Sequence, residues 1–130
     1  MTRQKVKKVL ASSRLDATPF YPSTADVKRW SEVLNVIMFE GKLPKWGKIY
    51  VRPMKDYGWC IPYWNGHGHR RAELHIRHKH ISFAGFYSIL AHELCHLAEW
   101  HELGTLHHGK FFWSHKEQLR KFGIKLKCPY

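Results

Sequence analysis

Acidic residues and cysteines are both scarce in this chain. Its 130 residues include 10 Asp and Glu against 22 Lys and Arg, so the formal net charge is +12. The three cysteines, Cys60, Cys95 and Cys128, are widely spaced and do not make the even, regular framework of a disulfide-stabilised domain. We therefore expect a reducing, intracellular setting.

Long hydrophobic runs are missing as well. No stretch approaches the roughly 20 apolar residues that a membrane-spanning helix needs, and the basic residues 1–10 lack the apolar core of a signal peptide. The hydrophobic fraction of 44% and the aromatic fraction of 15% instead fit one compact domain with a modest core. We expect a monomer with no membrane partner.

The excess of positive charge is spread over several segments, and it indicates an anionic partner. Cations gather in residues 3–14, 42–55, 70–79 and 110–127. Basic patches attract polyphosphates, and aromatic rings beside cations suit the stacking of single-stranded bases. Single-stranded DNA is thus a predicted partner, with an acidic protein as the alternative. Most rings between residues 46 and 64 are expected in the core of a small sheet, so none is assigned to DNA.

Periodicity predicts an α+β domain at residues 22–130, preceded by a basic arm at residues 1–21. The expected order is α-β-β-β-α-α. It comprises a helix at 23–39, strands at about 47–53, 58–64 and 72–78, an apolar helix after Ser82 that stops at Gly104, and a last helix lined by Phe111, His115, Leu119 and Phe122. The segment 65–69, which contains two histidines, is predicted to be a turn.

The apolar helix carries the most informative motif, His92-Glu93-Leu94-Cys95-His96. Residues four apart lie on one face of a helix, so both imidazoles can point at one metal ion. Glu93 then lies beside the metal, where it can take a proton from water. Because 11 histidines can produce such a match by composition, the flanking pattern matters. The apolar residues there form one stripe along the helix. A second, more polar stripe consists of Ser88, His92, His96 and Glu99, and we expect it to face a cleft.

A catalytic zinc ion usually has three protein ligands, so a third must come from elsewhere. His101, His107 and His108 all follow the motif within a short distance. Glu99 is a rival, but it lies on the same helix as the pair and would reach the metal only with distortion. A role beside the ligands, or a solvent-exposed position, suits Glu99 better.

Two motifs in order give the chain a family resemblance. His-Glu-Leu-Cys-His-Leu, a Trp four residues after the second His, and then His-Gly-x-x-Phe at 108–112 resemble the SprT-like zinc metallopeptidase domain, the family of bacterial SprT and the animal Spartan proteases. The resemblance is dense over residues 87–115. It implies that His92, His96 and His108 bind Zn²⁺, that Glu93 is the general base, and that the fold is a small zincin core with the active-site helix packed on a short three-stranded sheet.

The resemblance also implies a peptidase that acts on DNA-associated proteins, in the cytoplasm near the nucleoid or in a nucleus. A substrate would lie extended along an edge strand, and residues 72–78 are the predicted edge. Alternation there puts Glu73, His75 and Arg77 on one face, which makes them candidate substrate-binding residues. A single Cys128 cannot form the zinc ribbon of paired cysteines common in the family. Any DNA binding is then expected from the basic surface of the domain itself. The alternative function is a basic nucleic-acid-binding module with a purely structural zinc site.

Overall fold

The computed structural model describes residues 2–16, 18–106 and 109–121. The described chain folds as a mixed α+β structure with a three-stranded sheet. Its elements run in the order α1 (Arg3–Asp16), α2 (Thr24–Phe39), β1 (Lys48–Arg52), β2 (Gly58–Trp64), β3 (Arg70–Arg77), α3 (Phe83–Leu103), α4 (Lys110–Trp113) and α5 (Lys116–Arg120). No helix among the described residues is long and apolar enough to cross a membrane.

The sheet has the order β1-β3-β2, with β1 parallel and β2 antiparallel to β3. Strand β3 is therefore central, and the prediction that residues 72–78 form an edge strand was wrong. The alternation of Glu73, Leu74 and His75 shows which side chains share a face, but it carries no information on how many neighbours the strand has. The edges are β1 and β2.

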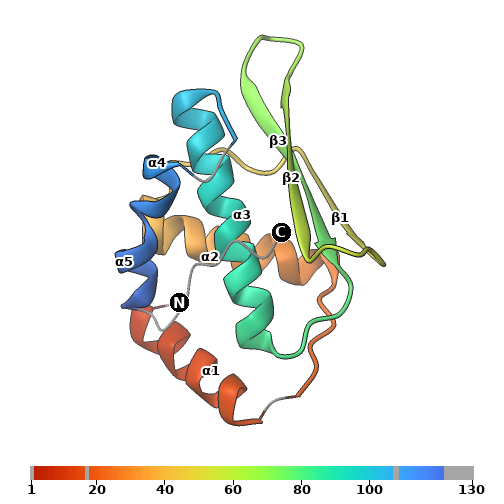
Figure 1. Ribbon diagram of the computed structural model, residues 1–130, viewed down its shortest axis with the longest axis vertical. Coiled ribbons are helices and arrows are strands. Elements are labelled where there is room, and N and C mark those ends of the chain that lie inside the picture. The colour runs from red at the N-terminus through yellow and green to blue at the C-terminus, as the bar shows by residue number, and fades with distance from the viewer. Residues whose placement is uncertain (1, 17, 107–108, 122–130) are drawn as a thin grey trace.

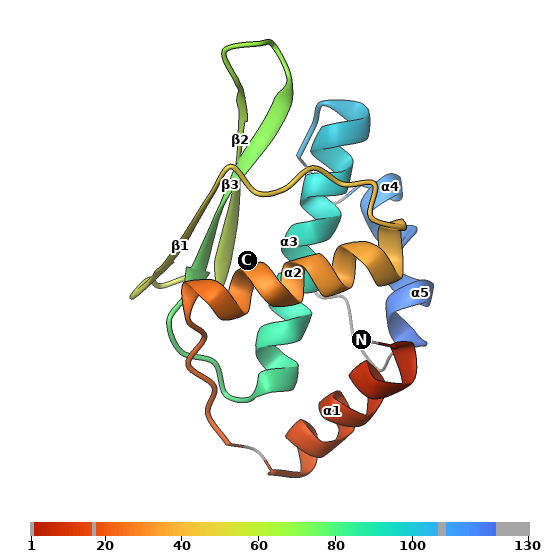
Figure 2. The same ribbon diagram turned by 180° about the vertical axis from the view of Figure 1, so that it is seen from behind.

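The helices all lie on one side of the sheet, as both views show (Figures 1 and 2). Helix α3 packs on β2 and β3, and α2 crosses behind it. Ala72, Leu74 and Ile76 of β3 point into this side and are fully buried. Within residues 2–16, 18–106 and 109–121, no helix lies on the opposite face of the sheet.

Helix α2 follows its sequence pattern closely. Ser23 is its N-cap: the Ser23 hydroxyl accepts the Asp26 backbone N–H, and the Asp26 carboxylate accepts the Ser23 N–H, which is a capping box. The predicted apolar stripe of Trp30, Leu34, Ile37 and Met38 is buried.

Residues 1–21, expected to be a basic arm, contain a helix instead. Val6 and Leu10 of α1 are buried, and the Ser13 hydroxyl accepts the backbone N–H of Ala84 at the start of α3. Val6 and Leu10 are four residues apart, which is helical spacing, but the surrounding lysines obscured it. Helix α1 is thus packed against the core.

The C-terminal region also differs from the predicted single helix. The chain forms two short helices, α4 and α5, which are separated by Ser114 and His115. Phe112 and Leu119 are buried as the pattern suggested, whereas Phe122 lies outside the described residues.

Candidate metal centre

Helix α3 positions the H-E-x-x-H motif. Its first turn is capped by Ser82, whose hydroxyl accepts the Gly85 N–H, and it ends at Gly104 in the left-handed conformation with φ 70°. Both ends are those expected from the sequence. Between them, every residue from Leu90 to Trp100 is buried, so the motif lies in the interior.

The motif brings together three side chains of metal-ligating type. One ligand atom from each of His92, Glu93 and His96 lies within 4.8 Å of the others. The two imidazole rings are 4.8 Å apart and nearly perpendicular, and His92 Nε2 is 3.9 Å from Glu93 Oε1. Imidazole nitrogen is a borderline donor that suits Zn²⁺ and related transition metals, and Zn²⁺ also accepts carboxylate oxygen. This group could hold a metal ion.

Glu99 fixes the orientation of one of these imidazoles. Its Oε1 lies 3.2 Å from Nδ1 of His96, and the Glu99 side chain is fully buried. A carboxylate accepts hydrogen bonds, so this contact favours a proton on Nδ1 and leaves the lone pair of Nε2 for a ligand bond. The solvent-exposed alternative for Glu99 is excluded, and a supporting role beside the ligands fits its position.

Phe112 of α4 covers the two histidines. Its ring centroid is 5.0 Å from that of His92 and 4.7 Å from that of His96, and Phe112 itself is fully buried. We expected the polar stripe of α3 to face a cleft. Its two histidines instead lie against the Phe112 ring, and Glu99 is buried as well. Periodicity separates polar from apolar faces, but it does not reveal that polar groups which contact one another can be buried together.

The third-ligand candidates fare differently. His107 and His108 lie outside the described residues. His101 is exposed, its backbone carbonyl accepts a hydrogen bond from Arg70, and within the described residues it does not join the cluster. Helix α4 begins directly after Gly109, and its Phe112 ring lies against His92 and His96.

Glu73, His75 and Arg77 lie away from the cluster. They occupy the face of β3 opposite to Leu74 and Ile76, while α3 lies on the inner face. His75 Nε2 is 3.4 Å from Glu73 Oε2, and Arg52 Nε donates to His75 Nδ1 at 3.2 Å. The structure does not bring these three residues to the metal-binding group.

Strand β2, which the sequence analysis did not assign to the site, is the edge strand beside α3. Burial, and then the nearby carboxylates of Glu93 and Glu99, raise the pKa of the Cys60 thiol well above its ordinary value. Cys60 is therefore close to the motif. Pro62 in the same strand was an available signal, because proline within a sheet is confined mainly to edge strands.

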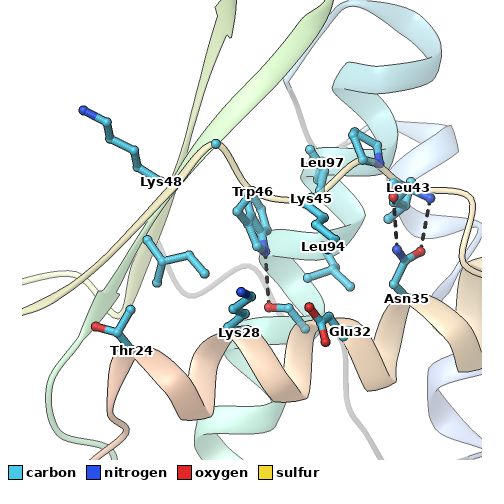
Figure 3. Close-up of a pocket in the computed structure, with 14 residues that line it drawn as sticks. Thr24, Lys28, Glu32, Asn35, Leu43, Lys45, Trp46, Lys48, Leu94 and Leu97 are labelled. Atoms are coloured by element: carbon cyan, nitrogen blue, oxygen red, sulfur yellow. Dashed lines mark hydrogen bonds between the residues drawn. The ribbon is translucent and has the colours of Figure 1, made fainter.

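A cavity of about 290 Å³ lies elsewhere, between α2, β1 and the segment that joins them. Figure 3 shows Trp46 above it, with its indole N–H donating to Ser31, and the Asn35 amide paired with the backbone of Leu43. Leu94 lines the cavity and points about half a turn round α3 from both histidines. The cavity is thus separate from the metal-binding group.

Comparison of the chain with protein-family models, curated proteins and solved structures finds no match.

Proposed function

We propose that this protein is a zinc-dependent metallopeptidase of the SprT-like type. One observation carries the proposal. The ligand atoms of His92, Glu93 and His96 lie within 4.8 Å of one another, and all three side chains are buried on one helix. Buried ionisable groups are costly unless they pair or bind a metal. A group whose chemistry matches a catalytic motif is therefore better explained by a metal centre than by composition.

In this proposal His92 and His96 hold Zn²⁺ from α3, and His108 supplies the third ligand. The bound ion would lower the pKa of water and polarise the peptide carbonyl. Glu93 accepts a proton from the attacking water while the water oxygen bonds to the carbonyl carbon. Glu93 then delivers that proton to the leaving amine nitrogen as the C–N bond breaks.

The proposal includes a small zincin core, in which α3 is the active-site helix and the three-stranded sheet is its support. The substrate would lie extended along β2, because this edge strand packs beside α3 and has Cys60 close to Glu93. Backbone pairing with a free edge gives affinity that depends little on side chains. The net charge of +12 supports substrates that are bound to DNA.

The test combines metal analysis with peptide hydrolysis. Purified protein should contain about one zinc per chain and cleave casein or histone, and a chelator should stop cleavage. Glu93→Gln should keep the metal but lower turnover by roughly a thousandfold or more, because an amide cannot accept the proton. Glu102→Gln is the matched control, since Glu102 is an exposed carboxylate on the same helix.

A second candidate is a basic nucleic-acid-binding module in which zinc only stabilises the fold. The complete burial of Glu93 favours this second candidate, because structural zinc sites are closed whereas catalytic sites keep one position open. Zinc binding with no hydrolysis in the wild type, or equal hydrolysis by wild type and Glu93→Gln, would replace the peptidase proposal with this one.

A further inference from the structure

The helix-free face of the sheet gathers aromatic rings and cations. Strand alternation and the register place ten side chains there: Lys48, Tyr50 and Arg52 from β1, Trp59, Ile61 and Tyr63 from β2, and Arg71, Glu73, His75 and Arg77 from β3. We call this set the outer face. Figures 1 and 2 show that no helix of the described part of the chain covers it.

Three rings form a row across the middle of the outer face. His75 pairs with Tyr50 on one side and with Trp59 on the other. The Tyr50 and His75 rings are stacked at 4.7 Å, and the Trp59 ring is 6.1 Å from that of His75. Tyr50 is 39% exposed and lies at the end of the row, on the edge strand β1. Another flat ring can stack on it there.

Cations surround this row. The Arg52 guanidinium lies 5.1 Å from the centre of the Trp59 ring, and its Nε donates to His75. The Arg77 guanidinium lies 5.4 Å from the centre of the Tyr57 ring. With Lys48 and Arg71 the outer face has four basic side chains, against one acid, Glu73, within the described strands. The charge complements a polyanion.

We propose that the outer face binds single-stranded nucleic acid. Bases would stack on the row of Tyr50, His75 and Trp59, and the backbone phosphates would contact Lys48, Arg52, Arg71 and Arg77. An open sheet with central aromatic rings and basic borders is a general solution for unpaired bases, because every base has a face to stack. Duplex bases are already stacked and cannot use such a row.

This site does not depend on the proposed metal centre. The sheet separates the two: the outer face points away from α3, whereas His92, Glu93 and His96 lie on α3. Glu93→Gln should therefore bind nucleic acid as the wild type does, so failure of one proposal would leave the other standing.

The first experiment asks whether the charge acts locally. Binding of a fluorescent 12-residue oligo-dT is followed by anisotropy at several salt concentrations. Lys48→Gln with Arg52→Gln should flatten the dependence of log affinity on log salt by about 1.4, since each lost phosphate contact on a single strand contributes about 0.7. The control, Lys7→Gln with Lys8→Gln, removes the same charge from exposed positions on α1 and should leave the slope nearly unchanged. Equal slopes for the two double variants would overturn the proposal.

The second experiment asks whether a ring is needed. Tyr50→Leu should weaken binding of oligo-dT roughly 5- to 10-fold, at the low end for loss of one stacking ring, while Tyr50→Phe should bind like the wild type. Oligo-U should bind about as well as oligo-dT, because stacking does not read the sugar. Equal binding by Tyr50→Leu and Tyr50→Phe, tighter binding of duplex DNA, or equally tight binding of poly-glutamate would each contradict a stacking site.

Discussion

Two pairs of closely spaced histidines in this chain have opposite surroundings. His92 and His96 are buried on α3, with their rings 4.8 Å apart and two buried carboxylates, Glu93 and Glu99, beside them. His67 and His69 are exposed in the turn between β2 and β3, with rings 6.3 Å apart. In that turn the Asn65 side chain accepts the backbone N–H groups of both histidines. Close spacing along the chain is thus common to both pairs, and only the pair buried beside carboxylates belongs to the group that could hold a metal ion.

The largest expected effect is on zinc affinity, when one histidine of each pair is replaced by alanine. His96→Ala should weaken zinc binding by at least about 100-fold, because even partners of the ligands are worth 10- to 100-fold. His69→Ala should leave zinc affinity unchanged. Competition with a chromophoric chelator measures both. If the two variants lost zinc equally, the buried pair would not be the metal centre.

A similar loss is expected at His108, the proposed third ligand. His108→Ala should lower zinc affinity by about 100-fold or more, whereas His107→Ala and His101→Ala should change it little. The basis is the His-Gly-x-x-Phe context of residue 108 together with the placement of Phe112 against both imidazoles. Metal titration of the three variants decides between them, and zinc loss in His107→Ala alone would move the assignment by one residue.

A smaller effect is expected at the carboxylate that supports His96. Glu99→Gln should weaken zinc binding about 10- to 100-fold, because an amide gives weaker support to the Nδ1 proton and lowers the basicity of Nε2. Glu102→Gln serves again as the control, since its side chain is exposed on the same helix. Equal zinc affinities for the two variants would mean that the contact of Glu99 with His96 is only structural.

The smallest effect concerns His80, which is buried outside both pairs. Burial lowers the pKa of His80 to about 4, although its ring nitrogen also contacts the Arg77 carbonyl at 2.9 Å. The unfolded chain therefore binds a proton at this residue between about pH 6.5 and pH 4 while the folded chain does not, so stability falls as pH falls through this range. The thermal midpoint of His80→Gln should decline less steeply there than that of the wild type. Parallel curves would show that His80 is not protonated on unfolding.

The sequence predicted local features well and spatial relations less well. The ends of α3 at Ser82 and Gly104, the stripe of α2 and the turn at residues 65–69 all follow from side chains near in sequence, and each was confirmed. Helical spacing likewise placed His92, Glu93 and His96 together. Such features depend on capping, backbone freedom and periodicity, which a single segment contains.

What the sequence did not predict depends on contacts between distant segments. The central position of β3 results from the parallel pairing of β1, which no alternation pattern encodes. The burial of His92 and His96 involves the ring of Phe112, and the packing of α1 involves contacts with α3. Aromatic rings assigned to the core, such as Trp59, instead lie on the outer face, because period-two alternation fits either face until the sheet has a partner.

The position of β3 between β1 and β2 has a consequence for how the chain folds. Strands β2 and β3 are joined by the short turn at residues 65–69, so they can pair through local contacts, and hairpins of this kind close within microseconds. Among the described strands β1 pairs with β3 alone, and it must close a longer loop that contains β2 before it gains this partner. We therefore expect the hairpin to form first and to act as the template for the sheet. A one-residue slip in its turn would exchange the inner and outer faces of one strand before β1 arrives.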